Sequence, residues 1–490
     1  MNIVWFKRDL RVQDHAPLAA AAALGPVLPL YIVEPEYWQQ PTASLRQWCF
    51  VRDSVRALAQ QLAELGQPLW VLSGHAPDIL QRLVQTHGVQ GLYSHMETGD
   101  GWTFARDQAV KKLGLPWREF RQHGVVRGLS IRRGWAEQWE TLMAEPQAAT
   151  PALQGPGAGP FELPESMPTP CQVSIAVQPG GSLAGHQLLD SFLSDRGREY
   201  TRQMSSPLSA GDACSRLSPH LALGTLSLRE VVQRLRATPA PDALWARSFR
   251  SLDKRLHWHC HFMQKLESEP RLEHEALHRG FVDLHSDPAD LEVIERWIEG
   301  HTGWPFVDAC MRCLKQTGWI NFRMRAMLVS LSAYHLWQPW QIPAQRLAQR
   351  FVDYEPGIHY SQIQMQSGTT GINVNRMYNP IKQSRDQDPD GEFIRRWVPE
   401  LAGFSADWIH EPWRAPAGLQ RKMGGPVPPP IADPVLAARQ AKQKLTAFIR
   451  QREMGDEAQR VLSQHGSRMR QTRPKYQRTS TDTPQQTLDF

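Results

Sequence analysis

Apolar runs and helical patterns alternate along the first 130 residues of the chain. The apolar runs, which we expect to be strands, cover residues 3–6, 27–33, 69–72, 91–94 and 117–120. The segments with apolar residues at helical spacing, which we expect to be helices, cover residues 45–65, 76–83 and 103–113. Strands of the buried type that alternate with helices predict a doubly wound α/β domain with a parallel sheet. Such a sheet binds ligands at the carboxyl ends of its strands, although no G-x-G-x-x-G motif follows the first strand.

The pattern changes after this α/β segment. Residues 144–184 are dense in Pro, Gly, Ala and Ser and have little apolar period, which predicts a linker. From residue 188 onward the apolar spacing is helical. We therefore expect four parts: an α/β domain (1–130), a linker (131–190), a larger all-α domain (191–435), and a basic helix with a disordered tail (436–490).

Residues 317–380 carry most of the candidate chemistry. Their first part has apolar residues at helical spacing with Arg323 and Arg325 between them, which predicts a helix. The second part, broken by Pro356 and by the glycines of 368–371, is expected to be an irregular loop. That part supplies carboxylate, imidazole and phenol groups: Asp353, Glu355, His359 and Tyr360. The combination indicates a lined cavity, and a helix flanked by a solvated loop is the alternative.

A second candidate cluster lies upstream, at residues 215–218. Ser218 precedes Pro219, an order typical of a helix start in which the serine is the N-cap. Free N–H groups at that start, with Ser215 and Arg216 nearby, could cradle a phosphate. Simple helix capping is the alternative.

Composition narrows the class of protein only modestly. The 490 residues have a formal net charge of +6 and a pI near 9.0, which agrees with a polyanionic partner without demanding one. The six cysteines lack the spacing of a disulfide framework, and neither His257 with His261 nor Cys310 with Cys313 has the further ligands of a metal site. We therefore expect no bound metal. The sequence has no leader segment and no apolar run long enough to cross a bilayer, so we expect a cytoplasmic protein.

Two long motifs identify a family. The run G-W-P-F-V-D-A-C-M-R-C-L-K-Q-T-G-W-I-N-F-R-M-R, followed by Y-N-P-I-K-Q-S-R-D-Q-D-P-D-G-E-F-I-R-R-W-V-P-E-L, closely resembles the flavin domain of the photolyase/cryptochrome family. The resemblance resumes at the amino terminus with V-W-F-K-R-D-L-R-V-Q-D-H and covers residues 1–435. It implies FAD in the helical domain and an antenna chromophore (a folate, a deazaflavin or another flavin) in the α/β domain. Iron–sulfur relatives use cysteines near the carboxyl end, and since none follows Cys313 we expect no cluster.

The resemblance also assigns residues to roles. It implies that FAD contacts Tyr200, Ser215, Arg216, Leu217, Ser218, Arg255, Arg325, Asp353, Glu355 and His359. It places Arg323 and Arg376 at the DNA backbone. Lys254 and Met365 stand where cyclobutane-dimer photolyases stack tryptophans on the lesion, so Lys254 also becomes a DNA-binding candidate. Ile363 replaces the proximal tryptophan of the electron relay; Trp340 matches the next position, and Trp337, Trp319 or Tyr360 are candidates for the missing one.

His359 stands where those enzymes place an asparagine near the flavin. Reversal of a (6-4) photoproduct moves a proton as well as an electron, and histidine suits proton transfer at physiological pH. We therefore expect light-driven, FAD-dependent repair of UV-damaged DNA, leaning to (6-4) photoproducts, with His359 as proton donor and Tyr360 as support. A structural role for His359 is the alternative. A cryptochrome without repair activity is the second hypothesis, and an unrelated nucleotide-binding enzyme built on the amino-terminal sheet is the third.

The carboxyl-terminal part predicts a further partner. Residues 435–452 have the pattern of a basic helix, and the segment beyond them is expected to be disordered. The chain ends in Q-x-x-L-x-F, with Gln485, Leu488 and Phe490, which resembles the peptide that bacterial repair proteins use to bind the replicative sliding clamp. We expect a monomer that engages damaged DNA and, through this peptide, the clamp.

Overall fold

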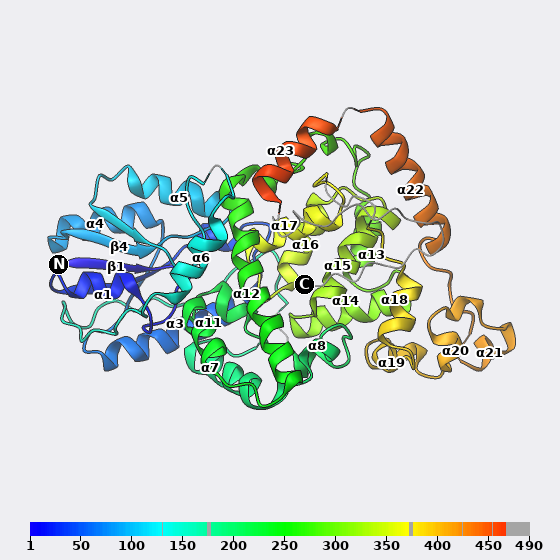
Figure 1. Cartoon of the computed structure of the whole chain (residues 1–490), viewed down its shortest axis with the longest axis horizontal. Coiled ribbons are helices and arrows are strands. Elements are labelled where there is room, and N and C mark those ends of the chain that lie inside the picture. Colours follow the sequence, from blue (N-terminus) through cyan, green and yellow to red (C-terminus); the bar gives the residue numbers. More distant parts are fainter. Residues whose placement is uncertain (130, 174–177, 372–375, 424, 453, 467–490) are drawn as a thin grey trace.

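The computed structural model describes residues 1–129, 131–173, 178–371, 376–423, 425–452 and 454–466. An α/β part lies at one end of the molecule and a larger helical part at the other (Figure 1). This arrangement confirms the predicted fold class. The predicted division at residues 130, 190 and 435 stays a prediction.

The α/β part is built on a parallel sheet of five strands in the order β3-β2-β1-β4-β5. Its strands are β1 (Asn2–Phe6), β2 (Val27–Val33), β3 (Trp70–Ser73), β4 (Gly91–His95) and β5 (Trp117–Phe120). Its helices are α1 (Ala16–Ala22), α2 (Pro35–Trp38), α3 (Leu45–Glu64), α4 (Ala76–His87) and α5 (Gly101–Lys111). The central strand β1 pairs with β2 from Asn2 opposite Val27 and with β4 from Asn2 opposite Gly91.

Both faces of this sheet are apolar because helices cover both of them (Figure 1). Val4 and Phe6 of β1 pack with α1 and α3, in a cluster that includes Leu18 and Trp48. The alternate residues Ile3 and Trp5 belong to a second cluster, on the side of α4 and α5. The central strands β1 and β2 therefore read as continuous, mainly apolar runs, as the sequence predicted.

The segment that links the two parts is not a free tether. Helix α6 (Trp135–Ala144) comes first, and its periodicity was overlooked in the sequence. The chain then follows the edge strand β3, where Val71 N–H donates to Pro160 O (2.9 Å) and Glu162 N–H donates to Val71 O (2.9 Å). The linker thus covers the edge of the sheet that β3 would otherwise leave exposed.

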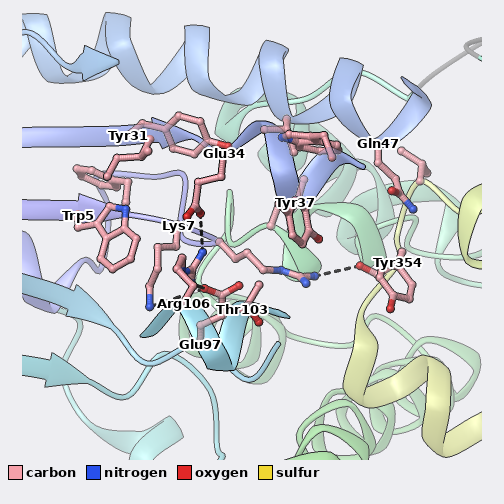
Figure 2. Close-up of a pocket in the computed structure, with 17 residues that line it drawn as sticks. Trp5, Lys7, Tyr31, Glu34, Tyr37, Gln47, Glu97, Thr103, Arg106 and Tyr354 are labelled. Carbon is pink, nitrogen blue, oxygen red and sulfur yellow. Dashed lines mark hydrogen bonds and ion pairs between the residues drawn. The ribbon is translucent and has the colours of Figure 1, made fainter. Parts of the chain in front are cut away.

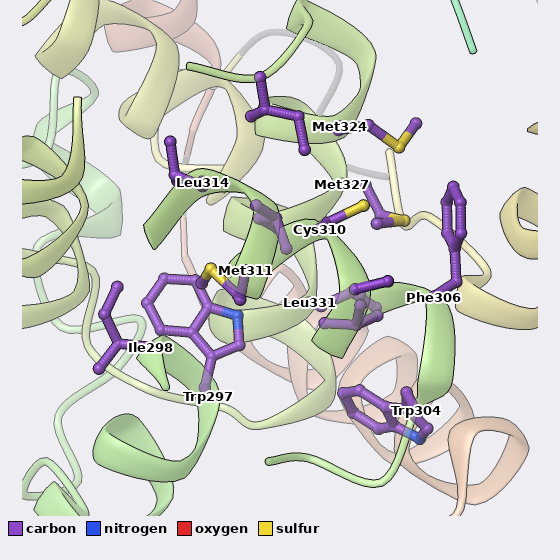
Figure 3. Packing of buried hydrophobic residues seen from close by; sticks show 14 of the residues in the cluster. Trp297, Ile298, Trp304, Phe306, Cys310, Met311, Leu314, Met324, Met327 and Leu331 are labelled. Carbon is purple, nitrogen blue, oxygen red and sulfur yellow. The ribbon is translucent and has the colours of Figure 1, made fainter. Parts of the chain in front are cut away.

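The helical part packs short helices around long ones. It comprises α7 (Ser182–Ser191), η1 (Phe192–Arg196), α8 (Tyr200–Gln203), α9 (Ala210–Ala213), α10 (Ser218–Ala222), α11 (Leu228–Ala237), α12 (Ala243–Ser268), η2 (Pro270–Glu273), η3 (Arg279–Phe281), α13 (Leu291–Ile298), α14 (Pro305–Thr317), α15 (Phe322–Ser330), η4 (Leu331–His335), α16 (Gln341–Arg350), α17 (Pro356–Gln366), α18 (Pro380–Gln387), α19 (Glu392–Trp397), η5 (Pro399–Leu401), α20 (Ala406–Ile409), η6 (Pro412–Arg414), α21 (Ala417–Lys422), α22 (Pro434–Arg450) and α23 (Gly455–His465). Its largest core lies between α13, α14 and α15, where Trp297, Met311 and Met327 are fully buried (Figure 3). This core fixes the helices that form one wall of the site described below.

The structure corrects three expectations about local structure. Residues 356–366 form α17 rather than an irregular loop: Pro356 occupies the first turn, where no N–H is needed, and the Glu355 side chain accepts from Gly357 N–H. The N-cap of α10 is Leu217, so Ser218 is already helical and does not cap. Residues 455–465 are helical as α23, anchored by the buried Val461, although we expected disorder there.

No helix in the described ranges combines the length and apolar character needed to cross a bilayer.

Candidate functional site

A cavity of about 1130 Å³ occupies the centre of the helical part. Its walls come from the loop before α10 and from α12, α15 and α17. Most of the residues assigned by resemblance line it: Tyr200, Ser215, Arg216, Leu217, Ser218, Arg255, Arg323, Arg325, Asp353, Glu355, His359 and Arg376. Residues far apart in the chain thus converge on one space large enough for a dinucleotide cofactor.

Arg325 and Asp353 form a bidentate ion pair in the cavity wall. The two Arg325 Nη atoms lie 3.0 and 2.9 Å from the two carboxylate oxygens of Asp353. Arg325 Nε donates to Ile320 O (2.7 Å), and the guanidinium lies 4.2 Å from the centre of the Phe351 ring. With two carboxylate bonds, one carbonyl bond and one aromatic face, the guanidinium is fixed in position. The guanidinium therefore presents a positive charge at a fixed position to an anionic group in the cavity.

Arg216, in the loop before α10, brings a second cation to the lining of the cavity. It has a left-handed backbone (φ 60°), which is uncommon for a residue with a side chain and is found at functional sites. Its guanidinium stacks 4.1 Å from the centre of the Trp319 ring. Its Nε is buried without a hydrogen-bond partner among the described residues, which leaves a donor for a ligand.

Glu355 lies where the cavity meets the α/β part. Arg8, in the loop after β1, donates to Glu355 Oε2 (2.8 Å) and to Tyr354 O (3.0 Å). Burial raises the pKa of Glu355 to about 7, and the charge of Arg8 limits that rise. A carboxyl group that titrates near neutral pH therefore sits in the wall of the cavity.

His359 faces the same cavity from α17. Its Nε2 lies 2.9 Å from Ala344 O, so that nitrogen carries the proton in the neutral ring. Burial lowers the pKa of His359 to about 4. The imidazole is therefore neutral at pH 7, and its Nδ1 is an acceptor.

Three further side chains of the lining each have a polar atom without a hydrogen-bond partner among the described residues. Asn321 Oδ1, Gln362 Nε2 and Gln383 Oε1 are buried and have no hydrogen-bond partner among the described residues. Buried polar atoms are rarely left in this state, so the donor and acceptor set fits a large polar ligand such as FAD.

Four assigned residues lie outside this lining. Lys254 is exposed on α12. Tyr360 is on the face of α17 turned away from the cavity and contributes to the core. Trp340 is in the same core, and Trp337 packs against His285 (4.8 Å between ring centres) and Lys444. Their roles stay predictions.

Other lining residues were missed in the sequence: Trp258, Phe322, Gln362 and Tyr378. Gln362 follows His359 by three positions, so a helical assignment of residues 356–366 would have placed it on the same face.

The carboxyl edge of the sheet was expected to hold the antenna. A pocket there, lined by residues such as Trp5, Tyr31 and Tyr37, measures only about 70 Å³. Figure 2 shows Arg106 and Glu34 pointing toward one another beside Trp5 and Tyr31; their ion pair is 2.8 Å long. Ligand pockets for molecules of cofactor size measure about 300–1,000 Å³. A chromophore at this position would require side chains such as Arg106 and Glu34 to move, and the identity of the antenna stays a prediction.

Asp9, His15 and His95 form a buried cluster behind that pocket. Asp9 Oδ2 accepts from His15 Nε2 (2.9 Å) and lies 2.8 Å from His95 Nδ1. His15 Nδ1 accepts from Leu18 N–H (3.1 Å), so both nitrogens of that ring are committed to hydrogen bonds. A metal ion would need a free lone pair on Nε2, so these contacts favour a structural network.

Comparison with known proteins agrees with this architecture. Residues 251–451 match the family model described as the FAD binding domain of DNA photolyase, and residues 2–134 match the model described as DNA photolyase. A deoxyribodipyrimidine photo-lyase of Vibrio cholerae is 30% identical over 448 residues, covering 85% of this chain and 94% of that protein. Cryptochrome-2 of Arabidopsis thaliana is 28% identical over 497 residues, covering 91% and 78%. The crystal structure of a bacterial class III photolyase from Agrobacterium tumefaciens has a TM-score of 0.79 and 28% identity, covering 91% of this chain and 97% of that one.

The fold and the cavity define a protein with a parallel α/β part and a helical FAD-binding domain. The chain belongs to the photolyase/cryptochrome family, as its motifs predicted.

Proposed function

We propose that this chain is a DNA photolyase, which uses light and FAD to repair UV-induced pyrimidine lesions. The bound flavin supplies light absorption and the transferable electron, and the protein supplies binding, orientation and charge. Arg216 and the Arg325–Asp353 pair, which line the same cavity, would hold the cofactor. Arg325 favours an anionic, reduced flavin because it places a fixed positive charge in the wall.

One observation carries this proposal: the lining of the central cavity reaches the surface and includes cations. Phe322 and Asp386 line the cavity and are exposed, and the half-buried Arg323 and Arg376 also line it. An opening with two cations suits a nucleotide extruded from a duplex, whose flanking phosphates remain outside. A cofactor alone would not require such an entrance.

We propose (6-4) photoproducts as the preferred lesion, with His359 as the proton-transferring group. Its pKa of about 4 keeps the imidazole neutral at pH 7 before substrate binds. Anionic groups in the cavity would raise that pKa, because a nearby negative charge favours the imidazolium ion. Tyr360 would then support His359 from within the core, since their ring centres are 5.4 Å apart.

The test uses the purified, FAD-loaded protein and oligonucleotides with one cyclobutane dimer or one (6-4) photoproduct. Chromatography after blue light or darkness would quantify the restored pyrimidines. We expect restoration of the (6-4) substrate in the light only. Repair of the dimer alone would overturn the lesion assignment, and two intact lesions would overturn repair.

A cryptochrome-type photoreceptor is the second candidate. The similarity to plant cryptochromes and the absence of tryptophan at positions 254 and 365 favour it. Light-dependent flavin reduction with both lesions left intact would support this function.

Further elements of the proposal concern partners. We propose a monomer whose terminal peptide, with Gln485, Leu488 and Phe490, binds the sliding clamp; these residues lie outside the described ranges. We also retain Trp340 and Trp337 as relay residues and Lys254 as a contact to DNA. We also propose a second, antenna chromophore in the α/β part, a folate, a deazaflavin or another flavin.

A further inference from the structure

Two cations are buried beside α12 without a compensating anion. Lys265 and Arg132 are each 7% exposed. Burial, with the repulsive charge of Arg132 as the second cause, lowers the pKa of Lys265 to about 7. Burial alone lowers the pKa of Arg132 to about 10. No carboxylate in the described ranges forms an ion pair with either side chain, although buried lysine and arginine are almost always paired.

Three segments that are far apart in the chain meet at these cations. Arg132, just before α6, donates from Nη1 to His261 Nδ1 (3.2 Å) and from Nη2 to His261 O (2.8 Å). His261, Lys265 and Glu269 are four residues apart and so share one face of α12. Helix α23 lies against that end of α12 (Figure 1), where His465 Nε2 is 3.9 Å from Glu269 Oε2. We call Arg132, Lys265 and His465 the basic cluster.

The basic cluster has hydrogen-bonding nitrogens that no described residue satisfies. Arg132 Nε and both ring nitrogens of His465 are buried and have no partner in the described ranges. His465 is 2% exposed, and burial, followed by the charges of Lys265 and Arg132, lowers its pKa to about 3. A water molecule could accept from one of these donors, but it would not neutralise two neighbouring cations. An anion would do both.

The acid beside the basic cluster is committed to other cations. Glu269 Oε1 accepts from Arg271 Nε (2.6 Å), and Glu269 Oε2 accepts from Arg460 Nη1 (3.2 Å). His465 lies beyond hydrogen-bond distance of this carboxylate. Glu269 therefore helps to hold α23 on α12 through Arg460, but it leaves the charges of Lys265 and Arg132 uncompensated.

We propose that Arg132, Lys265 and His465 bind a small inorganic oxyanion of the phosphate or sulfate type. Guanidinium and ammonium groups bind such anions through charge-assisted hydrogen bonds, and an imidazole N–H adds a further donor. The contributing side chains are at most 7% exposed, which favours a free anion over a nucleotide or a DNA phosphate. The bound anion would hold α23 against α12. This inference does not depend on the proposed repair function.

The experiment measures anion binding to the FAD-loaded protein by isothermal titration calorimetry, with inorganic sulfate, inorganic phosphate or adenosine monophosphate as the probe. Gluconate, which is too large for a buried site, keeps the ionic strength constant. Loaded protein is used so that FAD already occupies the central cavity. The variants are Lys265→Met and His465→Phe, and Lys442→Met is the matched control because Lys442 is exposed on α22.

Loss of a hydrogen bond to a charged group weakens binding about 10- to 150-fold, which is the effect expected of Lys265→Met on sulfate. His465→Phe should weaken sulfate binding by a smaller factor, and Lys442→Met should leave it unchanged. Inorganic phosphate should bind and adenosine monophosphate should not. Sulfate should also slow hydrogen exchange of the α23 amides in the unaltered protein and in Lys442→Met. Without sulfate, Lys265→Met should fold as well as the unaltered protein, because Met fills the space without a buried charge.

Sulfate binding should weaken severalfold as pH rises from 7 to 9. Sulfate keeps its charge over this range, whereas Lys265 of the free protein loses its proton because its pKa is about 7. The other charged or titratable side chains that face the cluster are Arg132, His257, His261, Glu269, Arg460 and His465. The arginines and the glutamate keep their charges, and burial holds the pKa of each histidine below this range. Lys265→Met should show no such dependence.

Three results would count against the site. Equal sulfate affinity in the unaltered protein and in Lys265→Met would overturn it, as would the lack of saturable binding to the unaltered protein. An equal loss in Lys265→Met and Lys442→Met would reduce the effect to net charge and would also overturn it. Binding of adenosine monophosphate as tight as that of phosphate would overturn the assignment to a free anion.

Discussion

Replacing Arg8 by Gln should add a loss of stability with rising pH above pH 7, where Glu355 in the unaltered protein contributes no further change. Arg8 is the cation that faces Glu355, at 2.8 Å, and the Glu355 side chain is only 5% exposed. Burial raises the pKa of Glu355 from its ordinary 4.5 to about 7 in the folded chain. The folded state therefore favours the protonated carboxyl group, and stability falls by about 3 kcal/mol as pH rises from 4.5 to about 7. Above that pH the contribution of this group is constant.

Without Arg8 the folded-state pKa of Glu355 rises further, so the variant continues to lose stability above pH 7. The loss is about 1.4 kcal/mol for each pH unit, or roughly 2 kcal/mol between pH 7 and 8.5. A loss of that size corresponds to about 4–8 °C in the thermal midpoint of a domain of 150–250 residues. Near pH 5.5 Glu355 is protonated in both proteins, and the difference should shrink to the loss of the bonds to Tyr354 O and Ala222 O.

The assay is the thermal midpoint of Arg8→Gln and of the unaltered protein between pH 5.5 and 8.5. Glu355→Gln and the double variant are the controls, because neither can titrate at this position. The two controls should differ from each other by an amount that does not change with pH. Equal destabilisation by Arg8→Gln at pH 5.5 and 8.5 would refute the reasoning.

Three further predictions concern flavin binding, a buried lysine and the terminal peptide. Asp353→Asn removes the charge that faces Arg325 and should lower the ratio of bound flavin to protein severalfold, whereas the surface substitution Asp407→Asn should leave that ratio unchanged. Lys265→Met should raise the thermal midpoint at pH 6, because burial beside Arg132 lowers the pKa of Lys265 to about 7 and the folded chain disfavours its charge; the gain should vanish as pH approaches 10.5, and an equal gain at all pH values would contradict it. Deletion of residues 485–490 should abolish co-purification with the sliding clamp and leave DNA binding unchanged, and an unchanged clamp interaction would exclude the peptide as its ligand.

The strands could be predicted from the sequence because most of their residues are apolar. The strands β1, β2 and β4 are buried on both faces, so β2 (Val27–Val33) has the bounds that its apolar run predicted. The edge strand β5 (Trp117–Phe120) is only partly buried, yet it also has the predicted bounds. Helix α17 was missed because Pro356 and Gly357 usually interrupt helices, whereas here they begin one. A local pattern does not show whether a proline lies inside a helix or in its first turn, since the preceding cap depends on Glu355.

Many residues that line the cavity could be predicted from the sequence, but the directions in which their side chains point could not. Arg325, Asp353 and His359 were assigned by resemblance, and all three line it. Tyr360 was assigned with them, but consecutive residues of a helix point about 100° apart, which turns Tyr360 into the core. Sequence position alone could not separate the two because the helix itself was not predicted.

Arg8 connects the small pocket at the strand ends with the central cavity. It lines the pocket beside Trp5 and Tyr31, and the same guanidinium binds Glu355 in the cavity wall. A ligand large enough to enter the pocket would have to displace side chains there, Arg8 among them, and would leave Glu355 buried without its cation. Breaking one partner from a buried ion pair costs about 3–5 kcal/mol, which any such ligand would have to overcome. Arg8 therefore braces the two parts against each other through Glu355, and a second chromophore at the strand ends would have to leave this contact intact or replace it.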